Sequence, residues 1–281
     1  MEEGRKNYKK AVAWICAVLL LILALLGGVQ AGVIYRKNSC LHWSPNYEKR
    51  DISALLEKDT FTKEEYRVLY EQTGLTELGV DGLLSRGEKS QILAIQEGFF
   101  GEYGLVEDHF GAFTYMYGID GQTRLAHLEN GDILVSSSTF TSWFQYGHSA
   151  LVVDGELDTI IESVSMGHLS EKWYAGSFAS RANFLVLRPD LPKEQREEIA
   201  LWAKDNLVGV PYRLTTGIFS KKYQEEIKTS HCSHLVWYAY KKFGVDLDSN
   251  GGAVVTPRDI ARSPRLKLVQ CFGFDIDELW G

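Results

Sequence analysis

An apolar segment at the N-terminus constrains this chain more than any other feature. No charged residue occurs from Ala11 to Tyr35, and the segment follows a basic start. About 20 apolar residues span the hydrocarbon core of a bilayer, so this segment is long enough to cross a membrane. We therefore expect residues 1–37 to be an uncleaved anchor, with a secretory signal cut after the small residue Ala31 as the alternative.

The location of the remaining chain follows from the charges around this segment. Basic residues before an apolar span favour a cytoplasmic N-terminus, although Arg36 and Lys37 on the far side oppose this orientation. We expect the bulk of the chain to lie outside the cytoplasmic membrane. The formal net charge is −7, which disfavours binding to a phosphate backbone, so no nucleic-acid partner is expected.

A change of pattern near Leu125 predicts two further regions. Residues 38–124 are expected to be a helical accessory region that serves as a packing or spacer element. One helix is predicted from the cap Thr62, with Glu65 completing a capping box, and a second over residues 88–100. Gly74 is expected to end the first of these helices.

Residues 125–281 are predicted to form an α+β domain with an antiparallel sheet. Short apolar runs between turn residues predict the strands. Longer runs ending at glycine predict the helices, and Thr229 or Ser230 is expected to cap the helix that contains Cys232. The expected strands and helices, in chain order, are GDILVSS, GHSALVV, DTIIESV, ANFLVLRP, LPKEQREEIALWAKDNLVG, HCSHLVWYAYKKFG, TPRDIARS and LKLVQCF.

The predicted hairpin around Gly155 brings a histidine near a carboxylate. A three-residue loop centred on Gly155 would place His148 directly opposite Glu162 on one face of the sheet. A loop of two or four residues would turn Glu162 to the other face. The sequence therefore predicts an imidazole–carboxylate pair that depends on the register of this hairpin.

Cys232 is the candidate nucleophile. A thiol in the first turn of a helix feels the positive end of the helix dipole, which lowers its pKa and favours the thiolate. A neighbouring imidazole lowers it further and can transfer a proton to a leaving group. Glu162 would orient His148, and the backbone N–H of Cys232 would face the developing oxyanion.

The order of the motifs resembles a known superfamily. GDIL, GHSALV, IIESV, FLVLR, GVPYRL and HCSHLVWYAY follow one another as in the YiiX-type branch of the NlpC-like papain superfamily. This resemblance covers roughly residues 125–281 and implies a circularly permuted papain-like fold, in which the histidine precedes the cysteine. It implies Cys232 as the nucleophile, His148 as the base and Glu162 as the orienting residue. No cofactor is implied.

The resemblance also bears on the substrate pocket. It implies that Tyr212 lines the pocket. Independently of the resemblance, the aromatic cluster of Trp143, Phe144 and Tyr146 before His148 is either a substrate wall or an aromatic loop packed on the sheet. The chain departs from the family pattern beside the nucleophile. His231 stands where an aromatic residue is expected, and His234 stands where an acidic one is expected.

The sequence leaves other roles for the cysteine open. Cysteine is often a small buried hydrophobe. A zinc site of His231, Cys232 and His234 is a second alternative, but neighbours at i, i+1 and i+3 do not share one helix face. Outside the cell, Cys40 and Cys271 could pair, which would leave Cys232 as the odd thiol.

The substrate class is a separate prediction. The resemblance implies cleavage of peptide or amide bonds, with a cell-wall peptide as the partner that suits a bacterial enzyme anchored in the membrane. Other permuted branches resemble lipid acyltransferases and thioesterases, so a membrane-proximal acyl substrate is the first alternative. A domain that has lost catalysis and binds a wall component is the second.

Overall fold

The computed structural model describes residues 2–38, 42–110, 113–118, 123–141 and 144–275. The chain divides into two compact units, which are described separately. The first comprises residues 1–40 and 141–144, and the second comprises residues 41–140 and 145–281.

The first unit is dominated by helix α1, Glu2–Asn38. Its apolar stretch, Lys9–Gly32, is exposed along its length and is long enough to cross a membrane. A secretory signal near the N-terminus also contains an apolar segment that meets this criterion of length and composition. The predicted apolar segment is therefore confirmed as a helix that is suited to a membrane span or to a signal sequence.

The second unit is built on a six-stranded antiparallel sheet in the order β10-β9-β3-β6-β7-β8. Five of these strands are the ones expected from apolar runs, and the edge strand β8 is an addition. The strands are β3 (Ile133–Ser136), β6 (His148–Asp154), β7 (Thr159–Glu162), β8 (Glu171–Tyr174), β9 (Phe184–Pro189) and β10 (Leu266–Phe272).

A smaller antiparallel sheet has the strand order β1-β2-β4-β5. Its first two strands lie within residues 38–124, which the sequence predicted to be helical. Their aromatic and β-branched residues favour extended backbone, which explains the difference. The strands are β1 (Leu105–Phe110), β2 (Phe113–Gly118), β4 (Thr139–Thr141) and β5 (Phe144–Gln145).

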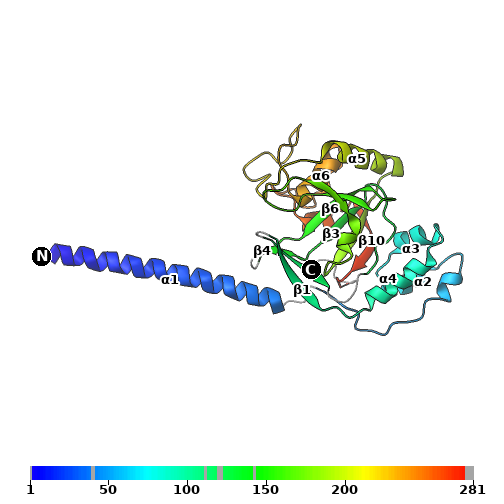
Figure 1. Ribbon diagram of the computed structural model, residues 1–281, viewed down its shortest axis with the longest axis horizontal. Coiled ribbons are helices and arrows are strands. Elements are labelled where there is room, and N and C mark those ends of the chain that lie inside the picture. The colour runs from blue at the N-terminus through cyan, green and yellow to red at the C-terminus, as the bar shows by residue number, and fades with distance from the viewer. Residues whose placement is uncertain (1, 39–41, 111–112, 119–122, 142–143, 276–281) are drawn as a thin grey trace. The chain divides into compact units, whose positions relative to one another are not determined.

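Helices cover both faces of the six-stranded sheet (Figure 1). Leu151 and Val153 of β6 join a core with the helices α5 (Lys193–Asn206), α6 (Cys232–Lys242) and α7 (Pro257–Ala261). Ala150 and Val152 point to the other face and join a second core. That core contains α2 (Lys63–Thr73), α3 (Glu77–Leu84), α4 (Lys89–Phe99) and the short 3-10 helices η1 (Leu55–Glu57) and η2 (Ala175–Phe178). The α+β class is thus confirmed.

The start and end of α2 follow the sequence prediction. The Thr62 side chain accepts from the N–H of Glu65, and the Glu65 carboxylate accepts from the N–H of Thr62, which completes the capping box. Gly74 ends the helix with a left-handed backbone, φ +71°. The carbonyl of Gly74 accepts from the N–H of Cys271 at 2.8 Å, so this turn joins α2 to strand β10.

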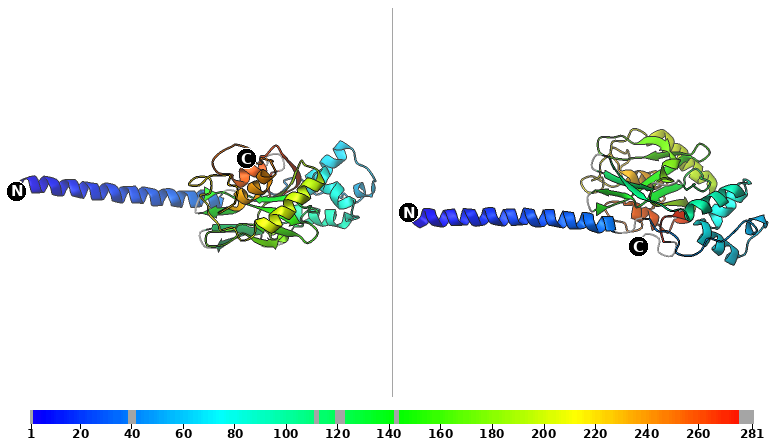
Figure 2. Two further views of the ribbon diagram at one scale, coloured as in Figure 1. Left: turned by 90° about the horizontal axis from the view of Figure 1, so that it is seen from above. Right: turned by 60° about the horizontal axis from the view of Figure 1, so that its bottom comes forward.

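Helix α3 was not predicted, and it also docks on β10. The hydroxyl of Thr76 donates to the carbonyl of Leu268 at 2.7 Å, and the N–H of Thr76 donates to the carbonyl of Val269 at 3.0 Å. Figure 1 and the right-hand view of Figure 2 show β10 beside the cyan helices. The helical region and the sheet therefore share one core.

A buried ion cluster fixes the ends of β3 and β9. Arg188 donates from Nε and Nη2 to the two carboxylate oxygens of Asp132, at 2.8 and 2.7 Å. It also donates from Nη1 to Glu129 at 2.6 Å, and Glu129 accepts from Arg196 of α5 as well. The hydroxyl of Tyr240 in α6 donates to the carbonyl of Gly131. These contacts hold α5 and α6 against the sheet.

Candidate active site

The β6–β7 hairpin brings His148 and Glu162 to the same face, but not in the predicted register. Leu151 pairs with Ile161, whereas the three-residue loop predicted that it would face Thr159. The predicted direct opposition of His148 and Glu162 is therefore wrong by two residues. A shift of two positions keeps a side chain on its face, so the two residues become diagonal neighbours.

Two irregularities that compensate each other explain this result. Asp154 pairs with Thr159, which leaves a loop of residues 155–158, and such a loop would turn Glu162 away from His148. The register then shifts between Val152 and Asp154, where Val153 is the extra residue of a bulge. The bulge returns Glu162 to the face of His148.

His148 and Glu162 form a buried hydrogen-bonded pair. The Nε2 of His148 lies 2.7 Å from the Oε2 of Glu162, and both side chains are more than nine-tenths buried. Burial raises the pKa of Glu162, but the hydrogen bond and charge of His148 and the charge of Arg181 lower it below its ordinary value. Burial lowers the pKa of His148, but hydrogen bonds with Cys232 and Glu162 raise it above its ordinary value.

An aromatic ring and a buried cation support this pair. The ring of Phe178, from η2, stacks on His148 with centroids 5.8 Å apart. The guanidinium of Arg181 lies over the Phe178 ring, 4.6 Å from its centroid, and is buried. Sequence reasoning missed both residues because nothing in SFASRANF distinguishes them from an ordinary loop.

Cys232 is the first residue of α6, as its predicted place in the first turn requires. The helix cap is not Thr229 or Ser230, as predicted, but His231, whose side chain accepts from the N–H of His234. Ser230 instead places its hydroxyl 2.9 Å from Nδ1 of His234, which removes it from the capping position. Short side chains with an oxygen acceptor are preferred at helix caps, so the sequence pointed to Thr229 or Ser230 and not to the imidazole of His231.

The thiol of Cys232 is buried among groups that favour its ionised form. The residue is 6% exposed. Burial raises the pKa of the thiol, but hydrogen bonds with His148 and His231, and the charges of both rings, hold it well below its ordinary value. The helix also contributes N–H groups in its first turn that have no partner within the helix.

His234, on the C-terminal side of Cys232, uses both of its ring nitrogens in contacts with other residues of the protein. The Nδ1 of His234 contacts the Ser230 hydroxyl, and its Nε2 lies 2.7 Å from the carbonyl of Lys222. Burial lowers the pKa of His234 to about 4. Both ring nitrogens are thus occupied. In the part of the chain that the structure describes, no three histidine, cysteine or carboxylate side chains are grouped to hold a metal ion.

The two tyrosines expected at the substrate pocket are each connected to a segment of the site, through different contacts. Tyr212 forms an isolated β-bridge with Ser230, two residues before the nucleophile. Tyr146 precedes His148 by two residues, and its hydroxyl donates to the carbonyl of Phe140 at 3.3 Å. Trp143, of the predicted aromatic cluster, lies outside the described residues.

The other cysteines considered in the sequence analysis are not part of this site. Cys271 is buried, its thiol donates to the carbonyl of Phe274 at 3.8 Å, and burial raises its pKa to about 12. Cys40, its candidate disulfide partner, lies outside the described residues. Cys16 is within the apolar stretch of α1.

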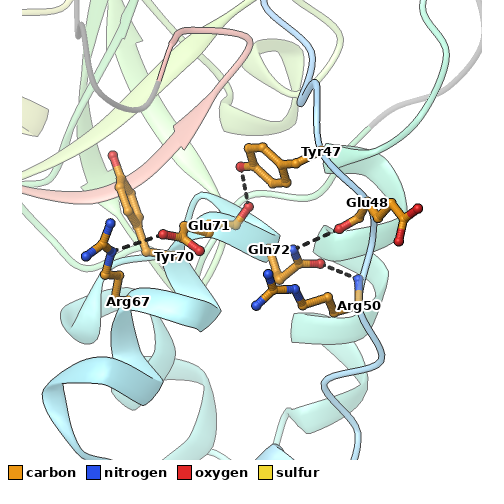
Figure 3. A pocket seen from close by; sticks show the side chains of 7 residues that line it. All are labelled: Tyr47, Glu48, Arg50, Arg67, Tyr70, Glu71 and Gln72. Atoms are coloured by element: carbon orange, nitrogen blue, oxygen red, sulfur yellow. Dashed lines mark hydrogen bonds and ion pairs between the residues drawn. The ribbon is translucent and has the colours of Figure 1, made fainter.

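Two surface hollows lie elsewhere and contain none of the three site residues. One of about 590 Å³ borders η2 and includes Arg124, Asp158 and Tyr174. The other, of about 550 Å³, is lined from α2 and the segment before it, and Figure 3 shows its side chains. There Arg67 pairs with Glu71, and Gln72 accepts from the N–H of Arg50. These interactions join residues of the hollow's own wall.

Comparison with known proteins finds similarity to a bacterial protein. The chain is 30% identical over 151 residues to the uncharacterized protein YycO of Bacillus subtilis (strain 168). The match covers 53% of this chain and 59% of the relative, so it spans somewhat more than half of each protein. No family model matches the chain. No solved structure matches it.

Proposed function

We propose that the chain is a thiol hydrolase that uses Cys232, His148 and Glu162 as a catalytic triad. The observation that carries this proposal is the buried contact of His148 with both Glu162 and Cys232, together with the lowered pKa of the thiol. A thiolate beside an imidazole that is oriented by a carboxylate is the arrangement that nucleophilic acyl transfer requires.

The proposed mechanism gives a role to each nitrogen of His148. Its Nε2 is engaged by Glu162, so the neutral ring carries that proton and leaves Nδ1 for Cys232. The Cys232 thiol transfers its proton to Nδ1, and the thiolate attacks the acyl carbon. The imidazolium then protonates the leaving amine as the carbon–nitrogen bond breaks. Water, deprotonated by Nδ1, hydrolyses the thioester and releases the acid.

We further propose that the substrate is a peptide or amide of the bacterial cell wall, cleaved on the outer side of the membrane. Two features support this: the apolar helix α1 is suited to an anchor, and the motif order resembles the permuted papain-like hydrolases. Residues 125–281 would then be a permuted papain-like domain, with Tyr212 and Tyr146 at its pocket. No cofactor takes part in this mechanism.

A second candidate substrate is a lipid or thioester acyl group at the membrane. The loop that leads into α6 carries exposed apolar side chains: Ile218 is 56% and Phe219 is 82% exposed. An acyl chain would contact such side chains more favourably than a charged peptide would. Assays with cell-wall peptides and with phospholipid or thioester substrates, on the same preparation, distinguish the two.

The test of the mechanism needs no substrate. The rate at which iodoacetamide alkylates Cys232 is measured against pH by peptide-resolved mass spectrometry, with the full chain in detergent micelles. We expect the rate to rise at a pH well below 9, and His148→Ala to move that rise to higher pH. If the pH profile is the same in wild type and His148→Ala, or if Cys232 stays unreactive, the result contradicts the triad and favours a binding module.

A further inference from the structure

His231 is fixed beside Cys232 by the way it caps α6. Its backbone is extended, with φ −129° and ψ 174°, and its side chain is 4% exposed. The N–H of His234 points at Nδ1 across 3.4 Å. A cap of this kind needs a lone pair, which an imidazole offers only from an unprotonated nitrogen.

The neighbouring hydroxyl does not compete with the helix cap for the lone pair of Nδ1. The Ser233 hydroxyl also lies 3.4 Å from Nδ1, but it donates to the carbonyl of Val255 at the shorter distance of 2.8 Å. Its single hydrogen is therefore used, and it does not donate to Nδ1. With its lone pair committed to the helix cap, the neutral His231 ring carries its proton on Nε2.

The Nε2 of His231 has no oxygen or nitrogen partner among the described residues, although it is fully buried. Buried donors in proteins are nearly always paired, because an unpaired one loses its hydrogen bonds to water. His231 is next to Cys232 in the chain, and its hydrogen bond and charge help to hold the pKa of that thiol down. The anion formed at Cys232 is a partner for this donor.

We infer that His231 is a second imidazole of the catalytic centre, whose Nε2–H donor faces the negative charge that forms at Cys232 and then on the acyl oxygen. This inference rests on the proposed hydrolase function. It divides the work between the two rings. His148, oriented by Glu162, exchanges the protons, whereas His231 keeps its proton and stabilises charge.

The test combines a variant that keeps the cap with a direct measurement on the wild type. In His231→Asn the side-chain oxygen caps the helix as well as any residue does, but the Nε2 donor is lost. We expect alkylation of Cys232 near pH 6 to slow about ten-fold, the size of one lost charge-assisted hydrogen bond. His231→Asp, another strong cap, should slow it more because it adds a negative charge. His234→Gln is the matched control, since its ring contacts Ser230 and Lys222.

The outcomes distinguish a failure of this inference from a failure of the proposed function. If His148→Ala shifts the alkylation profile and His231→Asn does not, the inference is wrong and the triad stands. If neither variant shifts the profile, the triad itself is wrong. Long-range ¹H–¹⁵N correlation in histidine-labelled full-length protein reads the tautomer without any substitution. A proton on Nδ1 of His231 overturns the inference even if the variants fail to fold.

Discussion

The Nε2 of His148 lies 2.7 Å from the Oε2 of Glu162, although the two residues are not cross-strand partners. They meet diagonally across β6 and β7, with the bulge at Val153 setting the face. Because the contact joins two strands of one hairpin, its geometry is fixed by the backbone. This geometry supports the proposed positioning role of Glu162.

Glu162→Gln tests that positioning role. The amide can still accept or donate a hydrogen bond at this place, but it cannot form the hydrogen bond to a carboxylate that raises the pKa of His148. A hydrogen bond to a charged group contributes about 1 kcal/mol more than a neutral one, so we expect kcat/KM to fall roughly ten-fold. Glu162→Ala should cost more, because it leaves a buried nitrogen of His148 without a partner. Equal rates for wild type and both variants would exclude the positioning role.

The pH dependence of turnover follows from two shifted pKa values. The pKa of Cys232 is lowered well below 9.0, so its thiolate is present below that pH; the pKa of His148 is raised above 6.5, so its imidazolium persists above that pH. We expect a bell-shaped profile of kcat/KM in which the acid limb reports the thiol and the alkaline limb reports the imidazolium. A single rise near pH 9 would show an uncoupled thiol.

Arg181 should make the imidazolium of His148 less stable. Its charge lowers the pKa of His148 and also lowers that of Glu162. In a Cys232→Ser background, the NMR titration of His148 should therefore move to higher pH when Arg181→Gln is added. Arg86→Gln is the control, because the guanidinium of Arg86 is on the surface beside Glu156. A titration that moves to lower pH with Arg181→Gln would mean that Arg181 acts mainly through Glu162.

The sequence predicted the local elements of this fold well and the long-range placement less well. The capping box of Thr62 and Glu65, the Gly74 stop and all strands of the six-stranded sheet except β8 were predicted, because each depends on residues close in the chain. The docking of α3 on β10 could not be predicted from the sequence, since it joins Thr76 to Leu268, which is far away in the chain. Such pairings depend on tertiary packing rather than on local preference.

The candidate site shows the same division. The placement of Cys232 at a helix start, and of His148 and Glu162 on one face, came from local patterns. The predicted register of the hairpin was wrong because a bulge at Val153 has no clear sequence signal in an apolar run. His231 as the cap, and Arg181 behind Phe178, depend on which side chain fills a space that several segments enclose.

The ion cluster behind the sheet should contribute strongly to stability. Arg188 contacts Asp132, which is fully buried, through two hydrogen bonds. Arg188→Ala leaves that carboxylate without its cation, and removing one partner of a buried pair costs about 3–5 kcal/mol. We expect the free energy of unfolding in urea to fall by about that amount.

Arg86→Ala supplies the comparison for this measurement. Arg86 contacts Glu156 at the surface, where water screens the pair, so the expected loss is under about 1 kcal/mol. Losses of similar size in the two variants would show that the Arg188 cluster is not a buried ion pair.

Gly74 should be the most sensitive glycine at the junction of α2 and β10. A Cβ at this position would lie 2.0 Å from the carbonyl oxygen of Cys271, and the backbone has φ +71°. Gly87 provides a matched control, because it has φ +74° and a Cβ added there would meet no atom within 4 Å. Gly87→Ala should cost about 1 kcal/mol from backbone strain alone. Gly74→Ala should cost several times more, because the clash separates α2 from the sheet, and hydrogen exchange should increase in both α2 and β10. If the two variants unfold at the same urea concentration, the helical region does not depend on this contact with the sheet.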